Sequence, residues 1–206
     1  MPTTRLTREE SQEQTRQRLI EAACKQVAER GFASTTVRDI AREAGYTQGA
    51  FYSNFKSKED LLLDLLREHK EQEALRITGA VATAGDDFAK AFEALASWAR
   101  EFGMDASQAM LATELQLHAA RNPEFGQAYA LLMAEQRQIY AQLLERLFAL
   151  AGHAPPAPAQ DLAGSLMALA RSQAIDHALY GAASAGDILI TVLRSLFPLP
   201  RQQAQP

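Results

Sequence analysis

The apolar residues of this chain recur with the period of an α-helix almost everywhere. In the long segments they stand three and four residues apart, and almost no segment alternates apolar with polar residues as a half-buried strand does. Breaks in this pattern fall at Gly31, Gly45, Gly103, Asn122-Pro123, 152–159 and 181–186. The pattern therefore predicts an all-α fold of about nine helices.

The first predicted helix begins at one of two capping boxes. Thr7-x-x-Glu10 and Ser11-x-x-Gln14 both place a hydroxyl three residues before an acid or amide, so that each side chain can bond the other residue's backbone N–H. The apolar stripe of this helix includes Ile20, Ala23, Cys24 and Val27, and the helix is expected to end at Gly31.

Two short helices follow, joined by the three-residue turn Gly45-Tyr46-Thr47. The first of them begins after Thr36, which forms a further capping-box pattern with Asp39, and the second covers residues 48 to about 54. Phe51 and Phe55 stand four residues apart on one face, which we expect to be buried. Two short helices with a glycine-containing turn, preceded by a helix, are typical of a helix-turn-helix DNA-binding domain.

The outward residues of the last short helix include no acid and suit a DNA groove. Gln48 can bond adenine at two atoms and Ala50 can contact a thymine methyl group, so both are candidates for base recognition, while Gly49 allows close approach of the backbone. Hydroxyl, ammonium and helix N-terminal groups suit phosphates, and Arg38 could contact either a phosphate or a base. The candidate DNA-binding residues are Thr36, Arg38, Thr47, Gln48, Gly49, Ala50, Tyr52, Ser53, Asn54 and Lys58. The alternative interpretation is a three-helix packing unit without a DNA-binding role.

The charge is distributed unevenly along the chain. The net charge is −4, with 47% hydrophobic and 22% charged residues, as in an ordinary globular protein. Residues 1–58 hold 10 Lys and Arg against 7 Asp and Glu, whereas residues 59–206 hold 11 against 18. This asymmetry favours a DNA-facing N-terminal part on an acidic body.

Residues 12–66 resemble the DNA-binding domain of the TetR family of bacterial transcription regulators. The residues that carry the resemblance are Gly31, Thr36, Ile40, Ala41, Ala44, Gly45, Gly49, Tyr52, Phe55, Lys58 and Leu61. The resemblance implies phosphate contacts from Thr36, Tyr52 and Lys58, and variable recognition positions at Gln48, Ala50 and Ser53. Tyr46 and Asn54 depart from the family pattern, where a small aliphatic residue and a histidine are more usual.

The pattern and the resemblance together suggest a division of the chain. We expect residues 1–58 to form the DNA-binding domain, with a linking fourth helix from Ser57 or Lys58 to about Gly79. Residues 59–197 are expected to bind an effector and to form the dimer, and residues 198–206 to be a disordered tail. Aromatic and polar residues on otherwise apolar helices are candidate effector contacts, although each is more often a core or solvated residue. They are Trp98, Phe102, Glu114, His118, Tyr140, Arg171 and His177.

The last two predicted helices, residues 160–180 and 187–197, indicate a homodimer. The second is apolar on nearly every side, and the last helix of a monomer is seldom buried all round. The alternative is a C-terminal helix packed into its own core, whereas the resemblance implies a four-helix bundle between two copies. The predicted interface consists of Leu162, Leu166, Leu169, Gln173, Tyr180, Ile188, Val192 and Leu196.

These features predict a cytoplasmic repressor that a small apolar or amphipathic effector releases from a palindromic operator. A DNA-binding protein controlled by a protein partner is the alternative. An enzyme is disfavoured, because the four histidines have no metal-binding spacing and no glycine-rich phosphate loop is present. No cofactor or metal is expected, and Cys24 is the only cysteine, which excludes an intramolecular disulfide. No stretch has the length of a membrane-spanning helix or of a secretory signal.

Overall fold

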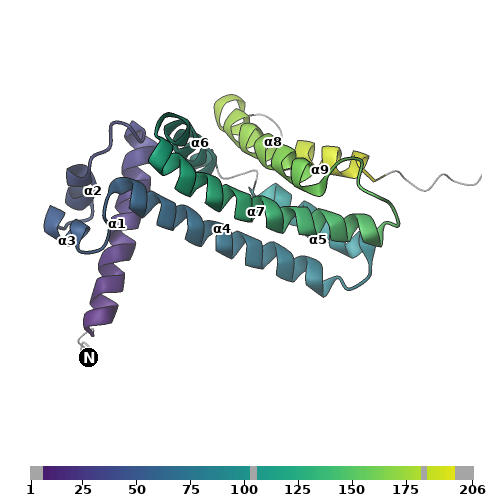
Figure 1. Cartoon of the computed structure of the whole chain (residues 1–206), viewed down its shortest axis with the longest axis horizontal. Coiled ribbons are helices and arrows are strands. Elements are labelled where there is room, and N and C mark those ends of the chain that lie inside the picture. The colour runs from purple at the N-terminus through teal and green to yellow at the C-terminus, as the bar shows by residue number, and fades with distance from the viewer. Residues whose placement is uncertain (1–6, 103–105, 182–184, 198–206) are drawn as a thin grey trace, which may run out of the picture. The chain divides into compact units, whose positions relative to one another are not determined.

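The computed structural model describes residues 7–102, 106–181 and 185–197, and every regular element in these ranges is an α-helix (Figure 1). The helices are α1 (Arg8–Arg30), α2 (Val37–Glu43), α3 (Gln48–Tyr52), α4 (Lys58–Thr83), α5 (Phe88–Phe102), α6 (Ala106–Arg121), α7 (Pro123–Leu150), α8 (Ala159–Tyr180) and α9 (Ala185–Ser195). The predicted all-α fold with nine helices is thus confirmed for the described part of the chain. The predicted C-terminal tail, residues 198–206, lies outside it.

The described residues form two compact units. The first contains the chain up to His69 together with Met110–Ala130, and the second contains Lys70–Ala109 together with the residues from Leu131 onward. The helices α4, α6 and α7 each contribute to both units, since the divisions fall within them.

The first unit is built around α1, with α2 and α3 packed beside it (Figure 1). Leu19 and Ala23 of α1, Ile40 of α2 and Phe51 of α3 have no exposed surface, as the predicted apolar stripes require. Of the two predicted starts of α1, Thr7 and Ser11, the helix begins after Thr7. Both hydrogen bonds of the capping box between Thr7 and Glu10 are present there.

Hydroxyl caps also fix the starts of the two short helices. The side chain of Thr36 accepts the N–H of Asp39, and that of Thr47 accepts the N–H of Ala50. In the predicted capping box at Thr36, the Asp39 carboxylate also accepts the Thr36 hydroxyl. Between the two helices, Gly45 has a φ of +76°, a backbone conformation that favours glycine.

The second unit has an aromatic and aliphatic core in which α9 packs against α5 and α8. The rings of Phe92 and Phe148 lie 5.8 and 4.5 Å from that of Phe197, just beyond the end of α9. Gly186, in the first turn of α9, approaches the end of α5 so closely that a Cβ there would lie 2.4 Å from the Cα of Arg100. The two backbones are therefore in direct contact at this point.

Several negative findings apply to the described ranges. None of their helices combines the length and the apolar character needed to cross a bilayer. In the same ranges no group of three or more His, Cys, Asp or Glu side chains could hold a metal ion. Cys24 is half-buried on α1, and burial raises the pKa of its thiol to about 11, so the thiolate is scarce at neutral pH.

Candidate nucleic-acid interface

The short helix α3 is anchored by its apolar side and exposes its polar side. Phe51 is completely buried and Phe55 is 2% exposed, with their ring centroids 5.8 Å apart. On the other side Gln48, Gly49 and Ser53 are exposed, and Tyr52 keeps 58% of its surface exposed. Thr47 is exposed as well, whereas Ala50 and Asn54 are half-buried. The face that the sequence predicts for DNA is thus accessible and contains no acidic residue.

The polar side chains of this face differ in how free they are to bind. The Ser53 hydroxyl donates to the carbonyl of Gly49 at 2.9 Å, and the Asn54 amide donates to the carbonyl of Ala50 at 2.8 Å. Within the described part of the chain, the side chains of Gln48 and Tyr52 have no hydrogen-bond partner. Gln48 and Tyr52 can therefore offer their full hydrogen-bonding capacity to a ligand.

The Lys58 side chain has a structural role that the sequence did not reveal. Its ammonium donates to the carbonyls of Phe32 at 2.8 Å and Thr35 at 2.9 Å, and lies 4.3 Å from the centre of the Phe32 ring. Lys58 thereby fixes the connection between α1 and α2, and one of its three N–H groups remains for a phosphate.

The start of α2 combines a stabilised cap with a free cation. The Thr36 hydroxyl donates to the Asp39 carboxylate at 2.6 Å, and this bond holds the pKa of Asp39 below its usual range. Arg42 pairs with the same carboxylate at 2.8 Å. Arg38 is exposed, and no acid of the described residues lies within ion-pair distance of it. Of these side chains, Arg38 is the one best able to reach a DNA phosphate or base edge.

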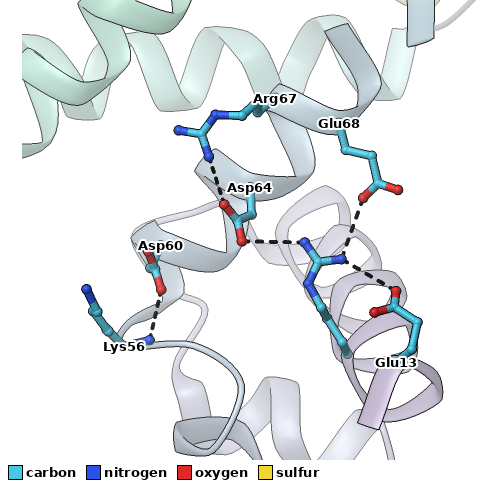
Figure 2. A network of polar contacts seen from close by, with 7 residues as sticks. Glu13, Lys56, Asp60, Asp64, Arg67 and Glu68 are labelled. Carbon is cyan, nitrogen blue, oxygen red and sulfur yellow. Dashed lines mark hydrogen bonds and ion pairs between the residues drawn. The ribbon is translucent and has the colours of Figure 1, made fainter. Parts of the chain in front are cut away.

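An ion-pair network joins α1 to α4 beside this surface (Figure 2). Arg16 lies 3.4 Å from Asp64 and 3.7 Å from both Glu68 and Glu13. Its guanidinium carbon is also 5.6 Å from the centre of the Phe55 ring. Asp60 accepts the backbone N–H of Lys56 at 2.9 Å, which fixes the connection from α3 to α4. These contacts hold the α3 anchor in place.

Two residues predicted to line the effector site lie in the first unit, at the connection between α1 and α2. Glu114 of α6 accepts the backbone N–H of Phe32, 82 residues away in sequence. A Cβ at Gly31, whose φ is +82°, would lie 3.2 Å from the Glu114 carboxylate. His118 packs between the rings of Phe32 and Phe125, with centroid distances of 4.5 and 4.9 Å. Contact of Glu114 and His118 with an effector stays a prediction.

The other predicted effector residues belong to the second unit. Trp98 of α5 is half-buried and Tyr140 of α7 is buried, and their ring centroids are 5.5 Å apart. Arg171 and His177 are half-buried on α8, and the side chain of Phe102 lies outside the described residues. The structure thus brings Trp98 and Tyr140 together in one core.

The predicted dimer residues all keep accessible surface in the single chain. Tyr180 is 76%, Ile188 44% and Val192 37% exposed. The remaining predicted interface residues, Leu162, Leu166, Leu169, Gln173 and Leu196, are half-buried. The expectation that α9 is apolar on every side is refined, because Leu189, Ile190 and Leu193 are covered by its own chain.

Comparison with known proteins bears directly on the α1–α4 region. The family model described as "Bacterial regulatory proteins, tetR family" matches residues 19–65, which include α2, α3 and the start of α4. This segment of the chain is therefore similar to the regulators of the TetR family. All the residues proposed above to contact DNA lie within the matched TetR segment.

Sequence relatives match stretches of 53 and 67 residues of this chain. The transcriptional regulator TtgR of Pseudomonas putida is 51% identical over 67 residues, which cover 31% of this chain and 31% of TtgR. The transcriptional repressor KstR2 of Mycolicibacterium smegmatis is 45% identical over 53 residues, or 26% of each chain. The matches span between 17% and 31% of the length of the curated relatives. Both of these relatives are named as transcriptional regulators.

A solved structure extends the likeness in fold to most of the chain. The regulator FadR of Bacillus subtilis, determined in complex with stearoyl-CoA, superimposes with a TM-score of 0.72 over 88% of this chain and 97% of FadR. The two sequences are 20% identical, so this match supports the fold alone.

Proposed function

We propose that this chain is a transcription regulator that places α3 in the major groove of operator DNA. The observation that carries the proposal is the acid-free, accessible face of α3, which rests on the completely buried Phe51. A rigidly held polar helix of this kind suits recognition of base edges. Residues 1–58 are assigned to DNA binding, and residues 59–197 to effector binding and dimer formation.

The DNA-contacting residues divide by chemistry. Gln48 and Ala50 are proposed to contact bases, with Gly49 allowing close approach, and Tyr52, Thr47 and Arg38 to hold phosphates. Thr36, Ser53, Asn54 and Lys58 stay in the proposed interface. Their side chains also bond their own chain, and they would contribute through the groups that remain free.

A homodimer would present two α3 helices to the two halves of a palindromic site. The partly exposed apolar residues of α8 and α9 support such a dimer, because Ile188 and Val192 would otherwise leave apolar surface in water.

Repression released by a small apolar or amphipathic effector is the regulatory mode that we propose. KstR2 is named a repressor, and FadR was solved with stearoyl-CoA, so this fold holds an amphipathic ligand in one relative. The helix α4 contributes to both units, so an effector that favours one conformation of the second unit could change operator affinity through it. Control by a protein partner is the alternative, and a failure of all small molecules to alter operator binding would favour it.

The decisive experiment begins with selection of bound sequences from random duplex DNA. The double variant Gln48→Ala with Tyr52→Ala should weaken binding to the selected duplex on the order of 100-fold, since a base contact contributes about 1–3 kcal/mol and the phosphate contact adds to it. The matched control is Gln116→Ala, which exchanges an exposed glutamine on α6. It should bind the selected duplex as tightly as wild type does. Unchanged binding by the double variant would refute the assignment of α3.

A further inference from the structure

A buried polar cluster lies within the second unit. It consists of Lys70 and Glu73 on α4, Gln136 and Tyr140 on α7, and the adjacent Trp98 on α5. Gln136 is 3%, Glu73 5% and Tyr140 8% exposed. The surrounding core is apolar, with Ile77 and Leu144 among its members, so that four hydrogen-bonding side chains here are unusual.

The two charges of this cluster compensate each other. The Lys70 ammonium lies 2.5 Å from the Glu73 carboxylate, and their side chains are 11% and 6% exposed. The Gln136 amide donates to the backbone carbonyl of Lys70 at 3.3 Å. The site is therefore close to neutral, and an ion of either sign brought into it would meet a like charge as well as an opposite one.

Two buried atoms of the cluster lack a hydrogen-bond partner among the described residues: the hydroxyl of Tyr140 and the amide oxygen Oε1 of Gln136. Buried polar atoms are almost always bonded, and an unbonded one destabilises the fold. Gln136 and Tyr140 stand four residues apart on one helix, so their side chains leave the same face of α7. Burial and the charge of Glu73 raise the pKa of Tyr140, which keeps its hydroxyl protonated and able to donate.

We infer that this cluster is the polar centre of the effector site, and that it takes a neutral apolar molecule carrying a hydroxyl group. The ligand oxygen would accept from the Tyr140 hydroxyl, and the ligand hydroxyl would donate to Gln136 Oε1. The apolar body of the ligand would lie against Trp98 and its aliphatic neighbours. The inference rests on the proposed function, since it specifies the effector of a ligand-responsive regulator.

Trp98 provides a direct measurement, because it is the only tryptophan of the chain and its ring centroid is 5.5 Å from that of Tyr140. Menthol and cyclohexanol are apolar alcohols that do not absorb where tryptophan does. Titrating each into the full-length protein should give a saturable change in Trp98 fluorescence for at least one of them. In Tyr140→Phe that alcohol should bind at least tenfold more weakly.

The matched control is Tyr129→Phe. Tyr129 is buried like Tyr140, but it lies in the first unit and its hydroxyl donates to the carbonyl of Ala112 at 3.5 Å. This variant should bind the alcohol with wild-type affinity. Equal weakening in both variants would overturn the inference, because the effect would then follow any loss of a buried tyrosine hydroxyl.

The stability of the ligand-free protein separates a ligand site from a structural one. Tyr140→Phe removes an unsatisfied buried hydroxyl and should raise the Tm, whereas Tyr129→Phe removes a bonded one and should not. If internal water satisfies Tyr140 permanently, the exchange to Phe lowers the Tm and leaves alcohol binding unchanged, which would overturn the inference. Absence of any fluorescence response in wild type would overturn it too.

Operator binding distinguishes this inference from the function on which it rests. Ligand-free wild type and Tyr140→Phe should bind the selected duplex equally, because Tyr140 lies in the second unit. If both bind DNA but the alcohols have no effect on Trp98, only the hydroxyl site is refuted. If neither binds any duplex, the proposed function itself fails, whatever Trp98 reports.

Discussion

The surface of α3 and the interior of the second unit differ in which side chains they expose to solvent. On α3, Gln48 and Tyr52 are exposed to water, and the apolar Phe51 beside them is wholly buried. In the second unit, Gln136 and Tyr140 are buried, while the apolar Ile188 and Val192 reach the surface. An interface for a charged, hydrated polymer needs no burial until it binds, whereas a site for an apolar molecule has to be enclosed.

This contrast agrees with the pattern of similarity to other proteins. The match to the family model covers residues 19–65, which include α2, α3 and the face proposed to bind DNA. Two solved structures share the fold over 91% and 88% of the chain at only 19% and 20% identity. Under the proposed function, a DNA-binding helix would impose similar demands on many regulators, whereas each effector would require a different interior.

The anchoring of α3 can be broken at Phe51. Phe51→Ala removes a completely buried ring and should lower the free energy of unfolding of the first unit by about 3–5 kcal/mol. Tyr52→Ala changes the neighbouring ring, which is 58% exposed, and should cost much less stability while still weakening DNA binding. Hydrogen exchange followed residue by residue measures both, and equal losses in the two variants would contradict the division of α3 into an anchor and a contact face.

The exposed apolar surface can be tested by introducing charge. Ile188→Glu combined with Val192→Glu should weaken the dimer at least ~100-fold, because two carboxylates would have to be buried at the interface. Sedimentation measured over a range of concentrations gives the dissociation constant. Leu75→Glu with Leu131→Glu is the matched control, since these leucines are 73% and 69% exposed outside the proposed interface. Dissociation of the control and not of the α9 variant would place the interface elsewhere.

A smaller effect is expected where α6 meets the connection between α1 and α2. Glu114→Ala leaves the buried N–H of Phe32 without its acceptor and should destabilise the first unit by about 1–3 kcal/mol. Glu114→Gln retains an acceptor oxygen and should lose less. Urea unfolding measures the free energy of unfolding of both variants. If Glu114→Ala and Glu114→Gln were equally stable, the hydrogen bond from the Phe32 N–H would contribute nothing to stability.

Local signals in the sequence predicted the helices and the exposed, acid-free face of α3 well. The caps at Thr7, Thr36 and Thr47 depend on residues three positions away, and the burial of Phe51 follows from helical period. The end of the third helix was predicted about two residues late, because Ser53 and Asn54 keep helix-like side-chain bonds after α3 has ended. The backbone geometry just after the end of a helix differs little from that of the helix itself, so the last residue is hard to predict.

Contacts between distant segments left no such signal. The ammonium of Lys58 reaches carbonyls 23 and 26 residues away, and no feature of the sequence near Lys58 indicates this. Trp98 and Tyr140 were predicted as separate candidates for effector contact, but the pairing of Lys70 with Glu73 inside the same core was not foreseen. An ion pair three residues apart on a helix is usually solvated, and only the packing of α4 shows that this one is buried.

The direct backbone contact at Gly186 has a mechanical consequence. With no side chain between α9 and the end of α5, displacement of one helix cannot be absorbed by a change of rotamer in that gap. Trp98 stands on α5 only two residues before Arg100, whose Cα lies at this contact. A molecule that displaced α5 at Trp98 would therefore shift the start of α9 as well. If the proposed effector acts in this way, Gly186→Ala should alter the response to it.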